Sequence, residues 1–318
     1  MCSNQEGLIA YPANAGIEQI STTSRSQKDK SEIKPKVNKK QEFILPIFHL
    51  RDLEKAVNFC NTLSQVRTEV LRGTVHPHGN NLEFGGMIHQ LDVLANIVSK
   101  VVLIFMEDVE LDREWTNHPK CQFALTPDLF VCVDGRNRSL FGKHRFLAFR
   151  LEAGCVEIKK LTFVKCGHSK AREGGAVRAS NVGHLFLKKC TFVDCNAKFG
   201  GAIFVGPEIH CSILSTIFLN CCATNHGACV FSSGFTKLIK STFSRCKATR
   251  GNGGAVFNNV GGSCEVTNCD FRGNYAQVAG SAFFNSPGSL ALLCDNFWEG
   301  NSTNKNAPGK TSGFHQGL

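Results

Sequence analysis

The second half of the chain, from residue 156 to residue 301, repeats one short phrase. Each copy has an apolar stretch and a Phe; four copies continue with a Cys three residues later, and three of these four then have a Gly-Gly-Ala step. The Phe residues recur every 25 to 29 positions and are Phe163, Phe192, Phe218, Phe243, Phe271 and Phe297. A repeat of this length is typical of stacked units that bury their apolar faces only against their neighbours.

The residues within each copy predict strands. They form short runs rich in Val, Ile, Thr and Phe, and the position five residues before each Phe is always apolar. Lys160, Lys189 and Lys240 interrupt this alternation three residues before their Phe, which indicates a bend. We therefore predict a strand, a bend, a second strand, a variable loop and a third strand that starts at Gly-Gly-Ala.

Such units predict an all-β fold, a right-handed single-stranded parallel β-helix of about seven or eight coils. Neighbouring coils would lie about 4.8 Å apart, and the chirality of strand connections favours the right-handed winding. The alternative is a β-sandwich with similar hairpins by coincidence. Two-residue hairpin turns between alternating runs are not evident, which disfavours it.

The Gly-Gly-Ala steps at 174–177 and 253–256 and the Phe-x-x-Asn at 271–274 resemble the repeats of chlamydial polymorphic outer membrane proteins. Similar repeats occur in right-handed β-helix proteins with the pectin-lyase-like fold. The resemblance covers about the second half of the chain. It departs from the family where Cys replaces Asn three residues after Phe in four copies. The resemblance implies a non-enzymatic, adhesin-like scaffold at the cell surface or outside the cell.

Composition shifts along the chain predict its organisation. We expect a disordered polar arm over 1–41, a cap region with helices over 42–100, the β-helix over 101–301 and a polar tail over 302–318.

Two helices are predicted in the cap region. The first has apolar residues at helical spacing, namely Leu53, Ala56, Val57, Cys60 and Leu63. The second runs over 89–99 and leads into a buried strand over 101–105. A helix placed before the first strands would cover the open end of the solenoid and prevent edge pairing.

The sixteen cysteines follow the repeat. Four share one position of the unit and would form a vertical ladder: Cys166, Cys195, Cys221 and Cys246. Two further pairs share other positions: Cys190 with Cys269, and Cys211 with Cys264. A Cys repeated at an inward position acts as a small apolar filler, although stacked cysteines could also reach disulfide distance. Because no C-x-x-C pair or zinc-type His and Cys spacing is present, we predict no metal site.

Enzymes of the pectin-lyase-like fold need paired carboxylates or a calcium-binding acid cluster. Asp194 and Asp270 stand at different positions relative to their Phe, so they would not stack. We predict a non-enzyme without catalytic or cofactor-binding residues, and His168, His210 and His226 as surface histidines. A polysaccharide-acting lyase or hydrolase is the alternative.

The formal net charge of +10 is compatible with attraction of acidic polysaccharide, anionic lipid or nucleic acid. The favoured interpretation is a solvated outer face, on which Lys160, Lys189 and Lys240 point to water. No nucleic-acid motif accompanies the basic residues, so we expect no nucleic-acid partner. We predict a protein or glycan surface partner, with acidic polysaccharide among the candidates. Specificity should lie on the flat faces or in the loops before each Gly-Gly-Ala.

No transmembrane segment is predicted, because Asp92, Asn96 and Lys100 interrupt the apolar stretch over 91–106. No secretory signal is visible either. An intracellular protein-interaction solenoid is therefore the alternative to the cell-surface location that the resemblance implies.

Overall fold

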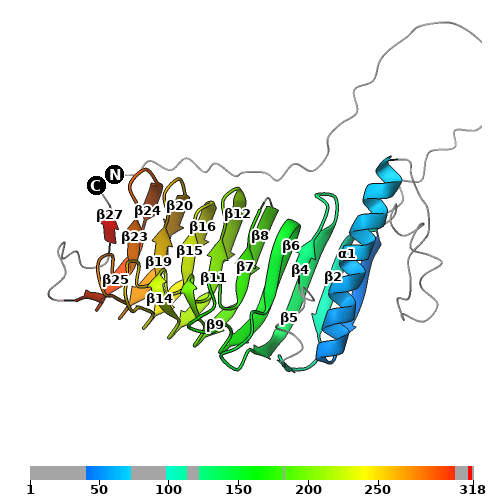
Figure 1. Ribbon diagram of the computed structural model, residues 1–318, viewed down its shortest axis with the longest axis horizontal. Helices are drawn as coiled ribbons and strands as arrows, with labels where there is room; N and C mark the ends of the chain where they lie inside the picture. Colours follow the sequence, from blue (N-terminus) through cyan, green and yellow to red (C-terminus); the bar gives the residue numbers. More distant parts are fainter. Residues whose placement is uncertain (1–40, 73–97, 113–121, 182, 305–313, 317–318) are drawn as a thin grey trace, which may run out of the picture. The chain divides into compact units, whose positions relative to one another are not determined.

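The protein is an all-β parallel solenoid of about seven turns with one N-terminal helix (Figure 1). This computed structural model describes residues 41–72, 98–112, 122–181, 183–304 and 314–316. Successive coils pair in parallel, with each repeat directly against the next. The predicted parallel β-helix fold is confirmed.

One regular coil contains four strands. In the second repeat these are β8 (Gly183–Lys188), β9 (Thr191–Val193), β10 (Asn196–Phe199) and β11 (Ile203–Val205). The sequence predicted three strands and a variable loop. The difference lies in that loop, whose first residues pair with the next coil and form a short strand of their own.

The strands of successive coils stack into four ladders. Ladder 1 contains β8, β12 (Ile209–Leu214), β16 (Phe235–Ile239), β20 (Ser263–Thr267) and β24 (Leu290–Cys294). Ladder 2 contains β9, β13 (Ile217–Leu219), β17 (Thr242–Ser244), β21 (Asp270–Arg272) and β25 (Phe297–Glu299). Ladder 3 contains β10, β14 (Cys222–His226), β18 (Lys247–Ala248), β22 (Tyr275–Ala276) and β26 (Ser302–Thr303). Ladder 4 contains β7 (Val177–Ala179), β11, β15 (Val230–Ser232), β19 (Val256–Asn258), β23 (Phe283–Asn285) and β27 (Phe314–Gln316).

The first coils are less regular. Their strands are β1 (Gln41–Ile47), β2 (Val98–Phe105), β3 (Val109–Glu110), β4 (Gln122–Ala124), β5 (Phe130–Phe141) and β6 (Phe149–Val164). The long strand β6 pairs in turn with β7, β8 and β9, so one continuous strand carries the chain across three ladders.

Helix α1 (Leu50–Arg72) covers the N-terminal end of the coils (Figure 1). Its residues Leu53, Val57 and Leu63 are fully buried and belong to the same core as the strands. Asn61 ties the helix to β4, since its amide nitrogen donates to the Gln122 carbonyl at 2.6 Å. The first predicted helix is confirmed.

The second predicted helix lies mostly outside the described residues. Its last two residues, Val98 and Ser99, belong to β2, so the prediction was wrong there. Val98 is buried and pairs with Gln41 of β1, and this partner makes the extended conformation the favourable one.

Strand pairing continues on both sides of the predicted solenoid limits at 101 and 301. Strand β1 pairs with β2 inside the expected cap region. Strands β26 and β27 pair with β22 and β23 inside the expected polar tail. Polar residues such as Ser302 and Thr303 join the ladder because backbone groups supply its hydrogen bonds.

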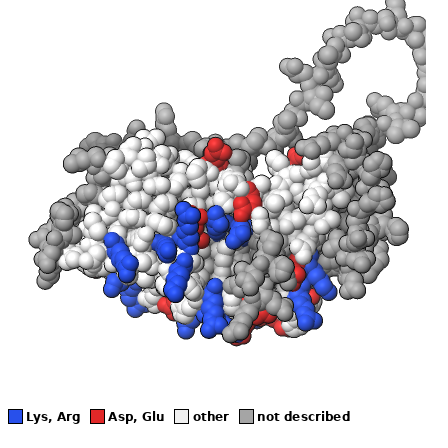
Figure 2. All heavy atoms as spheres, in the orientation of Figure 1, with Lys and Arg blue, Asp and Glu red and all other residues white. Residues whose placement is uncertain are grey.

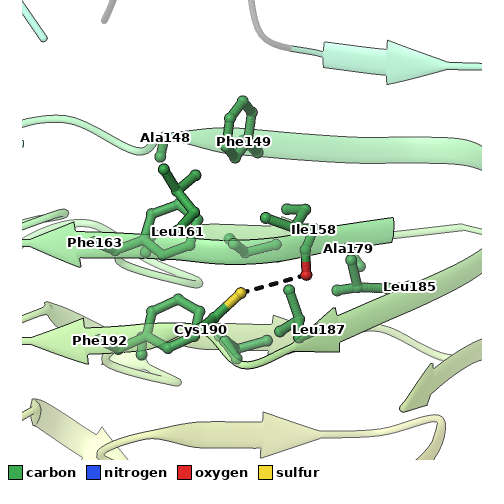
Figure 3. Close-up of a cluster of buried hydrophobic side chains, with 14 of the residues drawn as sticks. Ala148, Phe149, Ile158, Leu161, Phe163, Ala179, Leu185, Leu187, Cys190 and Phe192 are labelled. Atoms are coloured by element: carbon green, nitrogen blue, oxygen red, sulfur yellow. Dashed lines mark hydrogen bonds between the residues drawn. The ribbon is translucent and has the colours of Figure 1, made fainter. Parts of the chain in front are cut away.

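A column of stacked rings fills the interior. Phe163 and Phe192 lie face to face inside the coils (Figure 3), with ring centroids 4.7 Å apart and planes 5° apart. The stack continues through Phe218, Phe243, Phe271 and Trp298. These phenylalanines are fully buried, and each contributes about 1.5–3 kcal/mol through burial.

The last ring of the column is Trp298, which pairs with Phe271. The prediction of Phe297 at this position was wrong by one residue. Both alternations of β24 are apolar, so the pattern did not define which side faces inward. The observed register leaves Leu290, Leu292 and Phe297 outside, with exposed fractions of 72%, 61% and 50%.

The predicted bends are confirmed. Lys160, Lys189 and Lys240 have φ angles of 51°, 53° and 49°, in the left-handed region. A glycine makes the turn into ladder 4 in each repeat, for example Gly200 with φ 62°. The left-handed backbone conformation at these positions changes the direction of the chain between one ladder and the next, and the coils remain stacked.

Candidate functional site

The outer face of ladder 1 carries exposed rings on consecutive coils. Strand alternation directs Leu185, Leu187 and their counterparts inward, so the residues between them point outward. We define the histidine–phenylalanine face by its four outward residues: His184, Phe186, His210 and Phe235.

These rings stack across the coils. The centroids of His184 and His210 are 5.1 Å apart, and those of His210 and Phe235 are 5.5 Å apart. Phe186 extends the surface sideways, with its ring 6.3 Å from that of His184. Both histidines are exposed and both phenylalanines are half-buried. The backbone ladder fixes these positions, so the face is flat and preorganised.

Charged residues lie beside the rings on the same outer side. Glu157 neighbours Phe186 in the ladder, and Lys188 follows Phe186 by two residues. Lys237 follows Phe235 by two residues and forms an ion pair at 2.8 Å with Glu265 of the next coil. Partial burial lowers the pKa of His184, and the neighbouring His210 lowers it further. His184 is therefore mostly neutral at pH 7, and its imidazole offers a hydrogen-bond donor and an acceptor beside the phenylalanine rings.

The edge of the same ladder is basic. Lys160, Lys189 and Lys240 are exposed at three of the bends between ladders 1 and 2, and Ser215 occupies the bend between Lys189 and Lys240. On the side of the molecule that Figure 2 shows, Lys and Arg side chains gather mainly on the lower part of the solenoid. Cations beside a flat aromatic surface would favour an acidic ligand.

The three histidines singled out in the sequence lie in different environments. His210 belongs to the histidine–phenylalanine face. The Nδ1 atom of His168 accepts a hydrogen bond from the Lys170 backbone amide at 2.8 Å. His226 packs between Phe199 and Phe257, and this burial lowers its pKa. His226 is thus a packing residue, which the prediction of surface histidines missed.

A second aromatic column lies on the outer side of ladder 4. Its rings stack at 5.2 to 5.4 Å and are Phe204, Phe231, Phe257 and Phe284. The last three are buried in a small cluster separate from the main core. The sequence contains the pattern that predicts this column, because each Phe is the second residue of the strand that follows a Gly-x-Ala or Gly-x-Cys step.

The predicted cysteine ladder is present and fully buried. The Sγ atom of Cys195 lies 3.7 Å from the Phe163 carbonyl of the preceding coil, and Cys221 repeats this contact with Phe192. The described cysteines are present as thiols.

One further cysteine joins the ladder. Cys229 stands where other copies have Ala, and the sulfurs of Cys221, Cys229 and Cys246 all lie within 4.8 Å of one another. We call these three residues the thiol triad. The repeat predicted that Cys221 and Cys246 stack, but it did not include Cys229, which stands at a different position of the unit.

The acidic residues considered for catalysis lie apart in the ladders. Asp194 occupies a bend with φ 53°, and Asp270 lies on β21, where it forms an ion pair with Arg272 at 2.8 Å. A hollow of about 410 Å³ is lined by Leu111, Asp112, Lys143, Arg145 and Phe146. This lining has one carboxylate, whereas glycoside hydrolysis uses two.

Comparisons with protein-family models, with curated proteins and with solved structures found no match to this chain. Across the described ranges, no helix has the length and apolar character needed to cross a membrane.

Proposed function

We propose that the protein is a non-enzymatic binding scaffold and that the histidine–phenylalanine face is its binding surface. The observation that carries this proposal is the row of stacked, solvent-accessible rings on β8, β12 and β16. Contiguous exposed aromatic surface on a rigid face is a usual mark of an interaction site.

The chemistry of the face supports a protein or glycan surface partner. Phe186 and Phe235 offer apolar area, and the imidazoles of His184 and His210 offer donors and acceptors beside it. The lysines at the bends add positive charge along the edge, which favours acidic polysaccharide among glycans.

The resemblance of the repeats to those of polymorphic outer membrane proteins supports an adhesin-like role at a cell surface. An intracellular interaction scaffold would use the same face. The proposal of a binding surface is therefore independent of the compartment, and each location implies a different set of partners.

Neighbouring coils supply conservative test variants. Ser212 follows Phe186 in its outward row, and Ser263 follows Phe235 in the other. The double variant Phe186→Ser, Phe235→Ser therefore copies residues that the ladder already accommodates. As a matched control, Ile217→Thr removes an exposed apolar residue from ladder 2, where Thr191 and Thr242 flank it.

Binding of the three proteins to immobilised surface glycans, pectate included, and to purified surface proteins tests the proposal. We expect the wild type and the Ile217→Thr control to bind the same ligand, and the double variant to lose that binding. Equal binding by the double variant, or the absence of any ligand, would contradict the proposal. Release of product from pectate or a related uronide would instead favour the alternative of a polysaccharide-acting enzyme.

A further inference from the structure

The thiol triad brings three fully buried sulfurs together in the centre of the solenoid. Cys221 and Cys246 occupy the same position of consecutive repeats, three residues after Phe218 and Phe243. Cys229 approaches from the start of ladder 4 in the same coil as Cys221. The three side chains thus come from the residues just before β14, β15 and β18, and they converge without any short spacing in the chain.

A role as apolar filler does not account for Cys229. The other repeats have alanine at this position, namely Ala176, Ala202, Ala255 and Ala282, and all are fully buried. Alanine therefore satisfies the packing there. Only this copy has a cysteine at the position, and its sulfur lies beside ladder cysteines of its own coil and of the next.

The spacing of the sulfurs suits a single metal ion. Metal–sulfur bonds of about 2.3 Å in a planar three-coordinate site would place the sulfurs about 4.0 Å apart. The sulfurs are within 4.8 Å of one another, so each sulfur would move by less than about 1 Å to reach the separation of about 4.0 Å. Sulfur ligands select soft ions, among them Cu(I) and zinc.

We propose that the thiol triad binds one soft metal ion, with Cu(I) as the best match. Three converging sulfurs meet the needs of a three-coordinate soft ion, whereas structural zinc takes four ligands. Each thiol that binds as a thiolate releases one proton, and the ion undergoes no change in oxidation state.

Anaerobic titration of the reduced full chain with Cu(I) tests the proposal. Because the sulfurs are buried, Cu(I) is supplied both to the folded protein and during refolding. We expect one tightly bound Cu(I) per chain, with three sulfur neighbours in X-ray absorption. Cys229→Ala should bind Cu(I) more than about 100-fold more weakly, since even loss of an outer-shell partner costs about 10–100-fold.

Cys211→Thr is the matched control. It removes another fully buried cysteine of the same coil and introduces the residue that the next coil has at this position, Thr236. This control should bind Cu(I) like the wild type. Undiminished binding by Cys229→Ala, equal loss in the control, or no binding by either route would overturn the proposal. Displacement of Cu(I) by equimolar Zn(II) would overturn the choice of metal.

Discussion

Two kinds of side chain, a thiol and an amide, occupy the same position of the coil in different repeats. Three residues after the stacked ring, the first four repeats have Cys and the last two have Asn274 and Asn301. The Asn274 amide nitrogen donates to the Phe243 carbonyl at 2.9 Å, and its Oδ1 accepts from the Cys246 backbone amide, also at 2.9 Å. The thiol of Cys195 reaches the equivalent carbonyl only at 3.7 Å.

The difference shows that one backbone geometry accepts either a polar or an almost apolar column. We call the asparagines at this position the amide rungs and the cysteines at this position the thiol rungs. The amide rungs connect coils by hydrogen bonds worth about 1 kcal/mol each. The thiol rungs contribute mainly packing, and they keep a reactive group inside the core. The N-terminal repeats therefore gain sulfur chemistry at the expense of hydrogen bonding.

The largest contrast should be in the reactivity of adjacent cysteines. Cys221 is fully buried, whereas the neighbouring Cys222 is half-buried and points outward. We expect a thiol reagent to modify Cys222 in the folded protein, and Cys221 more than about a thousandfold more slowly, because its reaction requires unfolding. Mass spectrometry of the protein from its native source measures both rates.

The same labelling identifies the redox state of the ladder. If Cys166, Cys195, Cys221 and Cys246 react after denaturation without reductant, they are free thiols, which favours a reducing compartment. If they react only after reduction, they form disulfides and matured in an oxidising compartment. The second result would contradict the thiol rungs described here.

Next in size is the loss of an amide rung. Asn274→Ala leaves the Phe243 carbonyl and the Cys246 amide without their side-chain partner, so we expect a loss of about 3 kcal/mol in the free energy of unfolding. Asn274→Cys, which copies the thiol rungs, should cost only about half as much. Urea unfolding measures both variants, and equal losses would mean that the amide and thiol rungs are not interchangeable.

Buried cysteines outside the thiol rungs, such as Cys190, should also make the protein sensitive to alkali. Burial raises the pKa of the Cys190 thiol from 9.0 to about 12 in the folded state. The folded state therefore retains the proton longer, and the stability due to this group is complete below pH 9.0 and decreases between pH 9.0 and about 12. One pH unit above 9.0 the loss is about 1.4 kcal/mol per thiol.

Cys190→Thr tests this linkage, since Thr216 occupies the same position in the next coil. The variant should lose less stability than the wild type between neutral and alkaline pH in urea unfolding. Identical pH profiles would show that Cys190 does not titrate differently in the two states.

The smallest expected effect is the removal of one thiol. Cys195→Ala deletes a buried atom with a weak contact to the Phe163 carbonyl, and we expect a loss of about 1 kcal/mol. A loss as large as that of Asn274→Ala would contradict the view of the thiol rungs as mainly packing. Thermal unfolding of Cys195→Ala beside Asn274→Ala makes this comparison.

Local patterns predicted the solenoid because each ladder repeats the same requirement in every coil. Inward apolar residues such as Ile158 and Leu187, the lysine bends and the stacked Phe residues all recur. The register of β24 was not predictable from alternation, because Leu290 and Leu292 match one phase and Ala291 and Leu293 the other. Asn296 and Asn301 hold the true register by bonding to Cys269 and Asn274.

The candidate sites were less predictable than the fold. His184, His210 and Phe235 are separated by 25 or more residues, and only the in-register pairing places their rings together. Cys229 was visible as a departure from alanine, but its meaning depends on two cysteines that the coil brings beside it. Both sites therefore depend on the in-register pairing of successive coils.

Because of this dependence, the chain should accept inserted residues in the variable loops but not within the ladder strands. Between each thiol or amide rung and the next glycine turn, repeat lengths already differ, as in 167–173 against 196–199. Added residues there would protrude locally. One residue added within ladder 1 would exchange the inner and outer sides of that strand. During divergence, length changes should accumulate along one seam of the solenoid, while the opposite faces can change only by substitution.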